Sequence, residues 1–169
     1  MFVGVTRRLI KNPRLFMGFL FNFWPPVLGA GIRVLRVTQD LKLLKVGLPL
    51  RFYNRTGVGT HFGGSLYAMT DPFYMIMLIH QIGDEHVVWD KGATIDFVKP
   101  GKGLVTAQFE LTDDIINGIV EKAKSGEPII ETFRVSVVDG DQNVVANVEK
   151  KVYIKKKTKR IAVSESEFY

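Results

Sequence analysis

The stretch Gly59-Thr60-His61-Phe62-Gly63-Gly64-Ser65-Leu66-Tyr67-Ala68-Met69-Thr70-Asp71 decides the fold, because it leads from a loop into a strongly apolar segment. Apolar residues lie on nearly every side of a helix drawn through residues 64–82, and Gly83 stands where helices commonly end. A helix that is apolar all round is buried. We therefore predict a long central helix that a sheet must cover.

The segments around this helix have the composition and alternation of β-strands. Strands are predicted over residues 32–38, 41–52, 86–99, 104–111, 129–138 and 144–154. A slip in the apolar phase near Leu44-Lys45 predicts a bulge in the second strand. Residues 113–124 are predicted to form a short helix with Thr112 as its N-cap. The expected fold is α+β, with a curved antiparallel sheet wrapped around the central helix.

The first thirty residues are predicted to be a helical extension of the domain. Residues 5–22 favour one helix, which Pro25-Pro26 is expected to end. The apolar run 15–30 is shorter than the roughly 20 residues that span a bilayer, so no integral membrane segment is predicted. We expect this region to pack on the domain or on a partner subunit. Contact with a membrane surface is the alternative, favoured by the upstream cations Arg7, Arg8, Lys11 and Arg14.

Composition excludes several kinds of chemistry. The 169 residues contain no cysteine, which excludes disulfides and thiolate chemistry, and the three histidines are too scattered to predict a metal site. Five of the six net positive charges fall within residues 155–160. We therefore separate a main domain at 31–155 from the extension 1–30 and a basic tail 156–169. No aromatic residues interleave with the basic run, so nucleic-acid binding is not predicted. A cytoplasmic location is expected.

The Gly63-Gly64 pair and Asp71 carry the chemical interest. Adjacent glycines at a helix start expose backbone N–H groups to a ligand, and such donors stabilise a developing oxyanion. Asp71 follows Gly64 by seven residues, and a carboxylate on an apolar helix is costly unless it is paired or functional. The alternative is that Asp71 only caps a helix that begins at Pro72.

The spacing of these residues resembles a known family. The pattern Asn54-x-x-Gly57, then Gly63-Gly64, then Asp71, with Thr94-Ile95-Asp96-Phe97-Val98-Lys99-Pro100-Gly101 later, resembles hotdog-fold thioesterases of the phenylacetyl-CoA thioesterase type. The resemblance covers roughly residues 30–155. The whole chain is also similar to a hotdog branch that occurs alone and as the C-terminal domain of some bacterial acetyltransferase fusions. The Pro-Pro pair, the Gly-Gly-Ser-Leu-Tyr run and the Asp-Pro pair carry that second likeness.

The resemblance implies a homodimer, or a dimer of dimers, with sheets paired edge to edge. An acyl-CoA or acyl-carrier thioester would lie between the Gly63-Gly64 helix start of one subunit and the partner's Asp71. The glycine amides would polarise the carbonyl, Asp71 would act as general base or nucleophile, and Asn54 would orient the water or the carbonyl. No cofactor beyond the CoA thioester substrate is implied.

Two positions depart from the family pattern. Phe62 stands where the family commonly has histidine, with His61 one residue earlier, and Asp90 falls near an expected serine or threonine. The residues predicted to line the substrate are His61, Phe62, Ser65, Tyr67, Trp89 and Asp90. For His61 a local loop hydrogen bond is the alternative, and for Tyr67 and Trp89 it is core packing. The functional alternatives are a thioesterase, a non-catalytic binder of acyl-CoA or a lipid-like ligand, and, less favoured, a hydratase.

Overall fold

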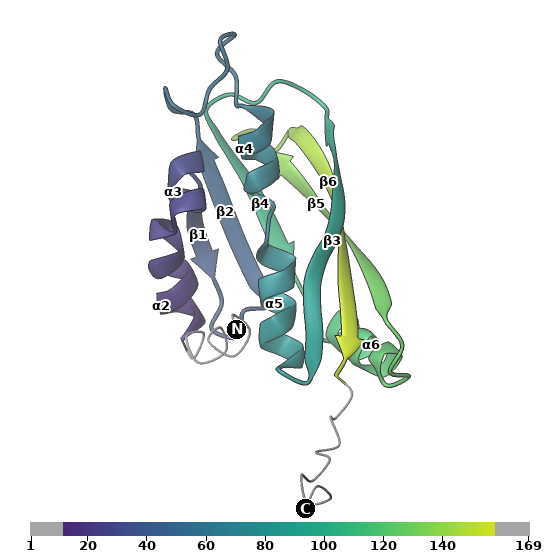
Figure 1. Cartoon of the computed structure of the whole chain (residues 1–169). Coiled ribbons are helices and arrows are strands. Elements are labelled where there is room, and N and C mark those ends of the chain that lie inside the picture. The colour runs from purple at the N-terminus through teal and green to yellow at the C-terminus, as the bar shows by residue number, and fades with distance from the viewer. Residues whose placement is uncertain (1–11, 158–169) are drawn as a thin grey trace, which may run out of the picture.

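The computed structural model describes residues 12–157, and its main feature is a six-stranded antiparallel sheet bent around helix α5 (Figure 1). The strands follow the order β1-β2-β4-β5-β6-β3 across the sheet. Their bounds are β1 Arg33–Val37, β2 Leu43–Pro49, β3 His86–Phe97, β4 Leu104–Glu110, β5 Ile129–Val138 and β6 Val144–Lys156. The predicted α+β architecture, a curved antiparallel sheet around a central helix, is confirmed.

The predicted bulge in the second strand is wrong. Strand β2 pairs with β4 in unbroken register, and the irregularity lies in β1, between Val34 and Arg36. The apolar phase slips because Leu41 is not in the strand. Its buried side chain comes from the preceding turn, where the backbone has φ 54°.

The predicted continuous helix over residues 64–82 is instead two helices. Helix α4 covers Gly63–Ala68 and α5 covers Phe73–Ile82, with a cis Asp71–Pro72 peptide in the break. Proline has no N–H to donate, and its ring clashes with the preceding turn, which is why the helix cannot continue. The predicted burial of the second part is confirmed, and Gly83 ends α5 as expected.

Aromatic packing fixes α5 against the sheet. The Phe73 ring lies 5.0 Å from that of Phe109, and Tyr74 stacks on Phe133 at 4.5 Å. The Tyr74 hydroxyl donates to the Arg134 carbonyl at 3.2 Å, so its polar end is satisfied inside the core. Helix α6, Asp113–Ala123, follows β4 in the chain. Its predicted N-cap is confirmed, because the Thr112 hydroxyl accepts from the Ile115 amide.

The amino-terminal extension packs beside α5, as predicted, but its elements differ. The described part contains α2 Pro13–Gly18, η1 Leu20–Phe23 and α3 Pro25–Ala30, while residues 5–11 of the predicted helix lie outside the described range. Pro25 and Pro26 begin α3 rather than end a helix, because proline suits the first helical turn, where the N–H needs no partner. Phe21 is buried 5.4 Å from Phe73, so this layer shares the core of the domain.

No helix within residues 12–157 is both long and apolar enough to cross a bilayer.

Candidate functional site

The start of α4 presents the Gly63-Gly64 pair as predicted from sequence. The Ser65 and Leu66 amides both donate to the Phe62 carbonyl, at 2.9 and 3.2 Å. Within residues 12–157, the amides of Gly63 and Gly64 have no hydrogen-bond partner. Two adjacent donors are therefore available to an acceptor placed at the helix start.

Packing of aromatic rings explains why both positions are glycine. A Cβ on Gly64 would lie 2.4 Å from the Phe62 ring, and one on Gly63 would lie 3.0 Å from the Phe97 ring. The two rings frame the helix start from the preceding loop and from the end of β3. Neither glycine has a left-handed backbone, so close approach rather than dihedral freedom accounts for them.

A cavity of about 380 Å³ lies between the start of α4 and the segment after β3. Gly63 and Leu66 line it from the helix, and Phe97 and Lys99 line it from the opposite side. His61 also contributes to the wall. The unpaired glycine amides thus lie at the edge of a hollow large enough for part of an acyl thioester.

His61 is buried in this wall, with 4% of its surface exposed. Its Nε2 lies 3.0 Å from the Gly103 carbonyl, while Nδ1 has no partner among the described residues. Burial lowers the pKa of the imidazole, against the weaker opposing effect of the Gly103 carbonyl. The ring is therefore neutral at pH 7. Because Nε2 donates to the carbonyl, Nδ1 is left as a hydrogen-bond acceptor.

Asn54 holds the loop that precedes α4. Its Nδ2 donates to the carbonyls of Ala30 at 3.2 Å and Pro49 at 3.0 Å, and its Oδ1 accepts from the Arg51 amide at 2.7 Å. The Asn54 carbonyl also accepts from the Phe62 amide. Backbone carbonyls accept both hydrogens of the Asn54 side-chain amide. This residue therefore fixes the loop that leads to the Gly63-Gly64 helix start.

Asp71 lies in a second cluster, where a lysine joins the two predicted carboxylates. The Lys150 ammonium forms an ion pair with Asp71 and lies 3.4 Å from Asp90. It also lies 5.7 Å from the centre of the Tyr67 ring. The lysine side chain is 2% exposed and that of Asp71 is 41% exposed, so the cation lies beneath a carboxylate that reaches the surface.

The capping alternative for Asp71 is wrong. Pro72 occupies the N-cap position of α5, which has no side-chain hydrogen bond at its start. The Asp71 carboxylate contacts Lys150 instead.

Lys150 was not identified from the sequence, although the strand pattern contains the signal. In β6 the residues Val148, Val152 and Ile154 are buried at alternate positions, and Lys150 occupies the same phase. A lysine within a buried apolar alternation is costly unless anions surround it. Its position in the pattern therefore predicts carboxylate partners.

A bulge in β3 places Asp90 in the same cluster. The register with β6 shifts between Asp90 and Gly92, so Lys91 is the extra residue and the phase of the strand changes there. Trp89, one residue before Asp90, lies on the other face and stacks on Tyr153 at 4.4 Å with an interplanar angle of 7°. The structure thus brings Asp90 to Asp71 and does not bring Trp89 there.

The charges in the cluster depend on each other. Burial raises the pKa of Asp90 to about 6, with the Lys150 ammonium opposing the rise and the Asp71 carboxylate adding to it. Burial works against the Lys150 charge, but the hydrogen bond to Asp71 and the charges of both carboxylates outweigh it and raise the pKa of Lys150. Lys150 consequently stays protonated at neutral pH, whereas Asp90 can gain or lose a proton close to neutral pH.

The remaining predicted residues divide between the two parts of the site. Ser65 is buried in the first turn of α4, and Phe62 is exposed in front of that turn. Tyr67 lies at the other end of α4, over Lys150. The Gly63 and Gly64 amides lie at the start of α4 and Asp71 lies beyond its other end, so one chain does not bring the amides to its own carboxylate.

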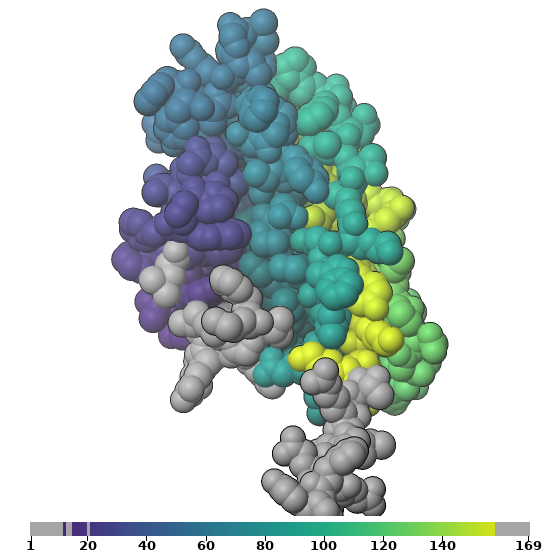
Figure 2. Space-filling model, in the orientation of Figure 1, coloured from purple at the N-terminus to yellow at the C-terminus, as the bar shows by residue number. Residues whose placement is uncertain are grey.

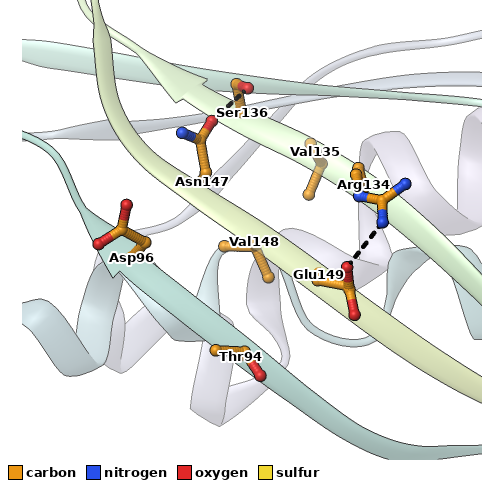
Figure 3. Close-up of a pocket in the computed structure, with 8 residues that line it drawn as sticks. All are labelled: Thr94, Asp96, Arg134, Val135, Ser136, Asn147, Val148 and Glu149. Atoms are coloured by element: carbon orange, nitrogen blue, oxygen red, sulfur yellow. Dashed lines mark hydrogen bonds and ion pairs between the residues drawn. The ribbon is translucent and has the colours of Figure 1, made fainter.

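Another hollow, of about 480 Å³, lies on the face of the sheet away from α5 (Figure 3). Four of its polar side chains are paired, Ser136 with Asn147 at 2.8 Å and Arg134 with Glu149 at 3.0 Å. Thr94 and Asp96 also line it, but it contains none of the residues predicted to catalyse the reaction or to line the substrate. We therefore place the candidate site at α4, α5 and β3.

A family model described as a domain of unknown function, DUF4442, matches residues 12–154, most of the described chain. The chain belongs to the DUF4442 family. No curated protein matches the sequence.

Solved structures similar to this chain share its fold at low sequence identity. A protein of unknown function from Pseudomonas aeruginosa, described as a probable thioesterase, has a TM-score of 0.69 and 15% identity, covering 93% of this chain and 97% of its own. A putative thioesterase from Shewanella oneidensis has a TM-score of 0.60 and 16% identity, covering 92% and 97%. The E. coli PaaI protein from the phenylacetic acid degradation operon has a TM-score of 0.56 and 14% identity, covering 88% and 96%. The predicted hotdog fold is confirmed.

Proposed function

We propose that this DUF4442 protein is a hydrolase of acyl-CoA or acyl-carrier thioesters. The observation that carries the proposal is the Asp71–Lys150–Asp90 cluster, a partly exposed carboxylate held over a buried cation in the break between α4 and α5. The descriptions of the Pseudomonas and Shewanella proteins as probable or putative thioesterases support the same class.

The complete site would require two copies of the chain. Strand β3 pairs only with β6 within residues 12–157, which leaves one side of a twelve-residue edge strand open. Asp90 lies on that strand, close to Asp71. Edge-to-edge pairing through β3 would bring the partner's Gly63-Gly64 helix start near this cluster, which a single chain cannot do. A homodimer is therefore part of the proposal.

In this dimer the two parts of the site would have separate tasks. The Gly63 and Gly64 amides would donate to the thioester carbonyl and stabilise the oxyanion as it forms. Asp71 would take a proton from water, and the resulting hydroxide would form a bond to the carbonyl carbon. The carbon–sulfur bond then breaks, and the thiolate takes the proton held by Asp71. The products are the free thiol and the carboxylic acid, and the Asp71 carboxylate is restored.

Lys150 would position Asp71 rather than react. Its ammonium is buried and already paired, so the substrate does not reach it directly. Fixing the carboxylate by a charge-assisted hydrogen bond keeps the base in one orientation. Asp90, whose pKa is raised to about 6, would share the proton with Asp71 until the thiolate takes it up.

Thiol release from acyl-CoAs of several chain lengths tests the proposal. Asp71→Asn preserves the size of the side chain, and we expect kcat/KM to fall about 10²- to 10⁴-fold, the usual contribution of a general base. Asp96→Asn is the matched control, because this carboxylate is on the same strand as Asp90 but on the opposite face. Equal rates for wild type and Asp71→Asn would overturn the catalytic role.

A non-catalytic binder of acyl-CoA is the second candidate function, favoured by the ion pair that already occupies Asp71. Titration calorimetry with an acyl-CoA and with its non-hydrolysable thioether analogue separates the two. Equal affinity for both without thiol release supports the binder, and turnover of the thioester supports the hydrolase.

A further inference from the structure

One side of the molecule carries exposed aromatic and aliphatic side chains that neither the core nor the proposed site uses. They lie on the amino-terminal layer α2–η1–α3 and on the loop between β2 and α4. We call this set the aromatic face. Its members are Leu15, Phe19, Phe23, Trp24 and Leu28 on the first layer, and Phe52, Tyr53 and Val58 on the loop.

Contacts between the two segments show that the loop and the end of α3 lie side by side. The Asn54 side chain bonds the Ala30 carbonyl at the end of α3, and the Tyr53 ring lies 3.1 Å from the position of a Cβ on Gly31. Within the helical layer, the ring centres of Phe19 and Phe23 lie 5.0 Å apart. Figure 2 shows the loop directly above the amino-terminal helices on the same side of the molecule.

The loop residues protrude instead of lining a groove. Phe52 is 83% exposed and Val58 84% exposed, although both are apolar. Free-standing apolar side chains at a loop tip suit insertion into a deformable layer of lipid headgroups.

The charge of the surrounding chain indicates the kind of lipid. Within the described part of the chain, residues 12–70 contain seven lysines and arginines and a single acid, Asp40. Arg51 and Arg55 flank Phe52 and Tyr53 in the loop, and both are exposed. Asp40 lies at the far end of β1, where its carbonyl accepts from Gln81 near the end of α5. Cations around interfacial aromatic residues attract anionic headgroups.

From this juxtaposition we propose that the aromatic face docks on the surface of a bilayer containing anionic lipid. The apolar tips enter the headgroup region while Arg51 and Arg55 pair with lipid phosphates. No helix crosses the membrane in this arrangement. The proposal is independent of the thioesterase hypothesis, because it uses none of the residues of that site.

Flotation with lipid vesicles tests the proposal on the full chain. We expect binding to phosphatidylcholine vesicles that contain about one third phosphatidylglycerol, weaker binding to phosphatidylcholine alone, and a decrease as salt rises from about 0.1 M to about 0.5 M. The double variant Phe19→Ser/Phe23→Ser should lower the partition coefficient about tenfold or more. Arg51→Gln/Arg55→Gln should lower binding to the anionic vesicles and remove most of its salt dependence.

Matched controls separate docking through the aromatic face from nonspecific hydrophobic adsorption to vesicles. Leu104→Ser/Ile130→Ser removes two exposed aliphatic side chains outside the aromatic face and should leave the partition coefficient unchanged. Circular dichroism melts check that each variant is folded. In a Trp89→Phe background Trp24 is the only tryptophan, and its emission should shift to the blue on anionic vesicles.

Three outcomes would overturn the proposal. The first is no binding to anionic vesicles, and the second is binding that the aromatic variants leave unchanged. The third is a concentration-dependent dimer that Phe19→Ser/Phe23→Ser dissociates while the wild type ignores vesicles, which would assign the face to a second copy of the chain.

Discussion

The two parts of the proposed site are built from different groups. At the start of α4 the functional groups are backbone amides, and the side chains around them, Phe62 and Phe97, only shape the space. In the second cluster the functional groups are the side chains of Asp71, Asp90 and Lys150, which come from the helix break and two strands. The first depends on one local segment, and the second depends on three elements that meet only in the folded sheet.

This difference predicts how each part responds to substitution. Most side-chain substitutions leave a pair of backbone amides in place. The pair loses its ability to bind an acceptor when the surrounding backbone moves or when a methyl group covers it. A cluster of charges fails when its cation is removed, because the two carboxylates then face each other without their partner. The following variants test that contrast.

Removing Lys150 should have the largest effect. In Lys150→Met, Asp71 and Asp90 face each other without a cation, so we expect about 2–3 kcal/mol lower unfolding free energy at pH 8 and strongly reduced thioester hydrolysis. The loss of stability should be smaller at pH 5, where Asp90 takes up a proton. Denaturant unfolding at both pH values measures this. Lys151→Met, on the outer face of the same strand, is the control, and equal loss in both variants would contradict the role of the cluster.

Asn54→Ala tests the loop that leads to the glycine amides. It should lower the free energy of unfolding by about 2–3 kcal/mol, because the Arg51 amide and two backbone carbonyls lose their hydrogen-bond partner. If Asn54 acts only through the loop, kcat of the folded variant should change less than about threefold. Urea denaturation and thiol-release kinetics measure the two quantities separately. A large fall in kcat at unchanged stability would instead support the predicted role of Asn54 in orienting water or the carbonyl.

The raised pKa of Asp90 predicts a pH dependence of stability. Its folded pKa of about 6 lies above the ordinary value of 3.8, so the folded state binds more protons between these values and loses stability as pH rises through them. The asparagine of Asp90→Asn cannot ionise. The free energy of unfolding of this variant, relative to that of the wild type, should therefore rise by about 1–2 kcal/mol as the pH rises from 4 to 7. Melting curves across this range measure the gain. A constant difference would show that Asp90 ionises normally.

Gly64→Ala should have the smallest effect on folding and a moderate one on catalysis. Alanine favours the helix, but its methyl group displaces the Phe62 ring and shields the amides, so we expect unchanged or slightly higher stability and about tenfold lower kcat/KM. Thermal melts and thiol-release assays give both quantities. Recovery of activity in Phe62→Ala/Gly64→Ala would assign the loss to the ring rather than to the methyl group.

The sequence correctly predicted those features that depend on local pattern. The strands β4, β5 and β6, the capped helix α6 and the glycine helix start follow from alternation, capping and turn residues. The continuous central helix and the helix-ending role of Pro25 were wrong for one reason. A proline can begin a helix or break one, and hydrophobic pattern alone does not distinguish these outcomes.

The site divides in the same way. Gly63, Gly64 and Asp71 stand out in the sequence, because two adjacent glycines and a lone acid violate the pattern of a buried helix. Lys150 is 79 residues beyond Asp71. The pairing of β6 with β3 and the bulge at Lys91 bring it to Asp90, and the packing of the α4–α5 break on the sheet brings it to Asp71. The sequence by itself determined a buried helix, a sheet to cover it and the residues at the helix start. Only the tertiary structure decided which charges meet, because burial makes each ionised group depend on partners supplied by distant strands.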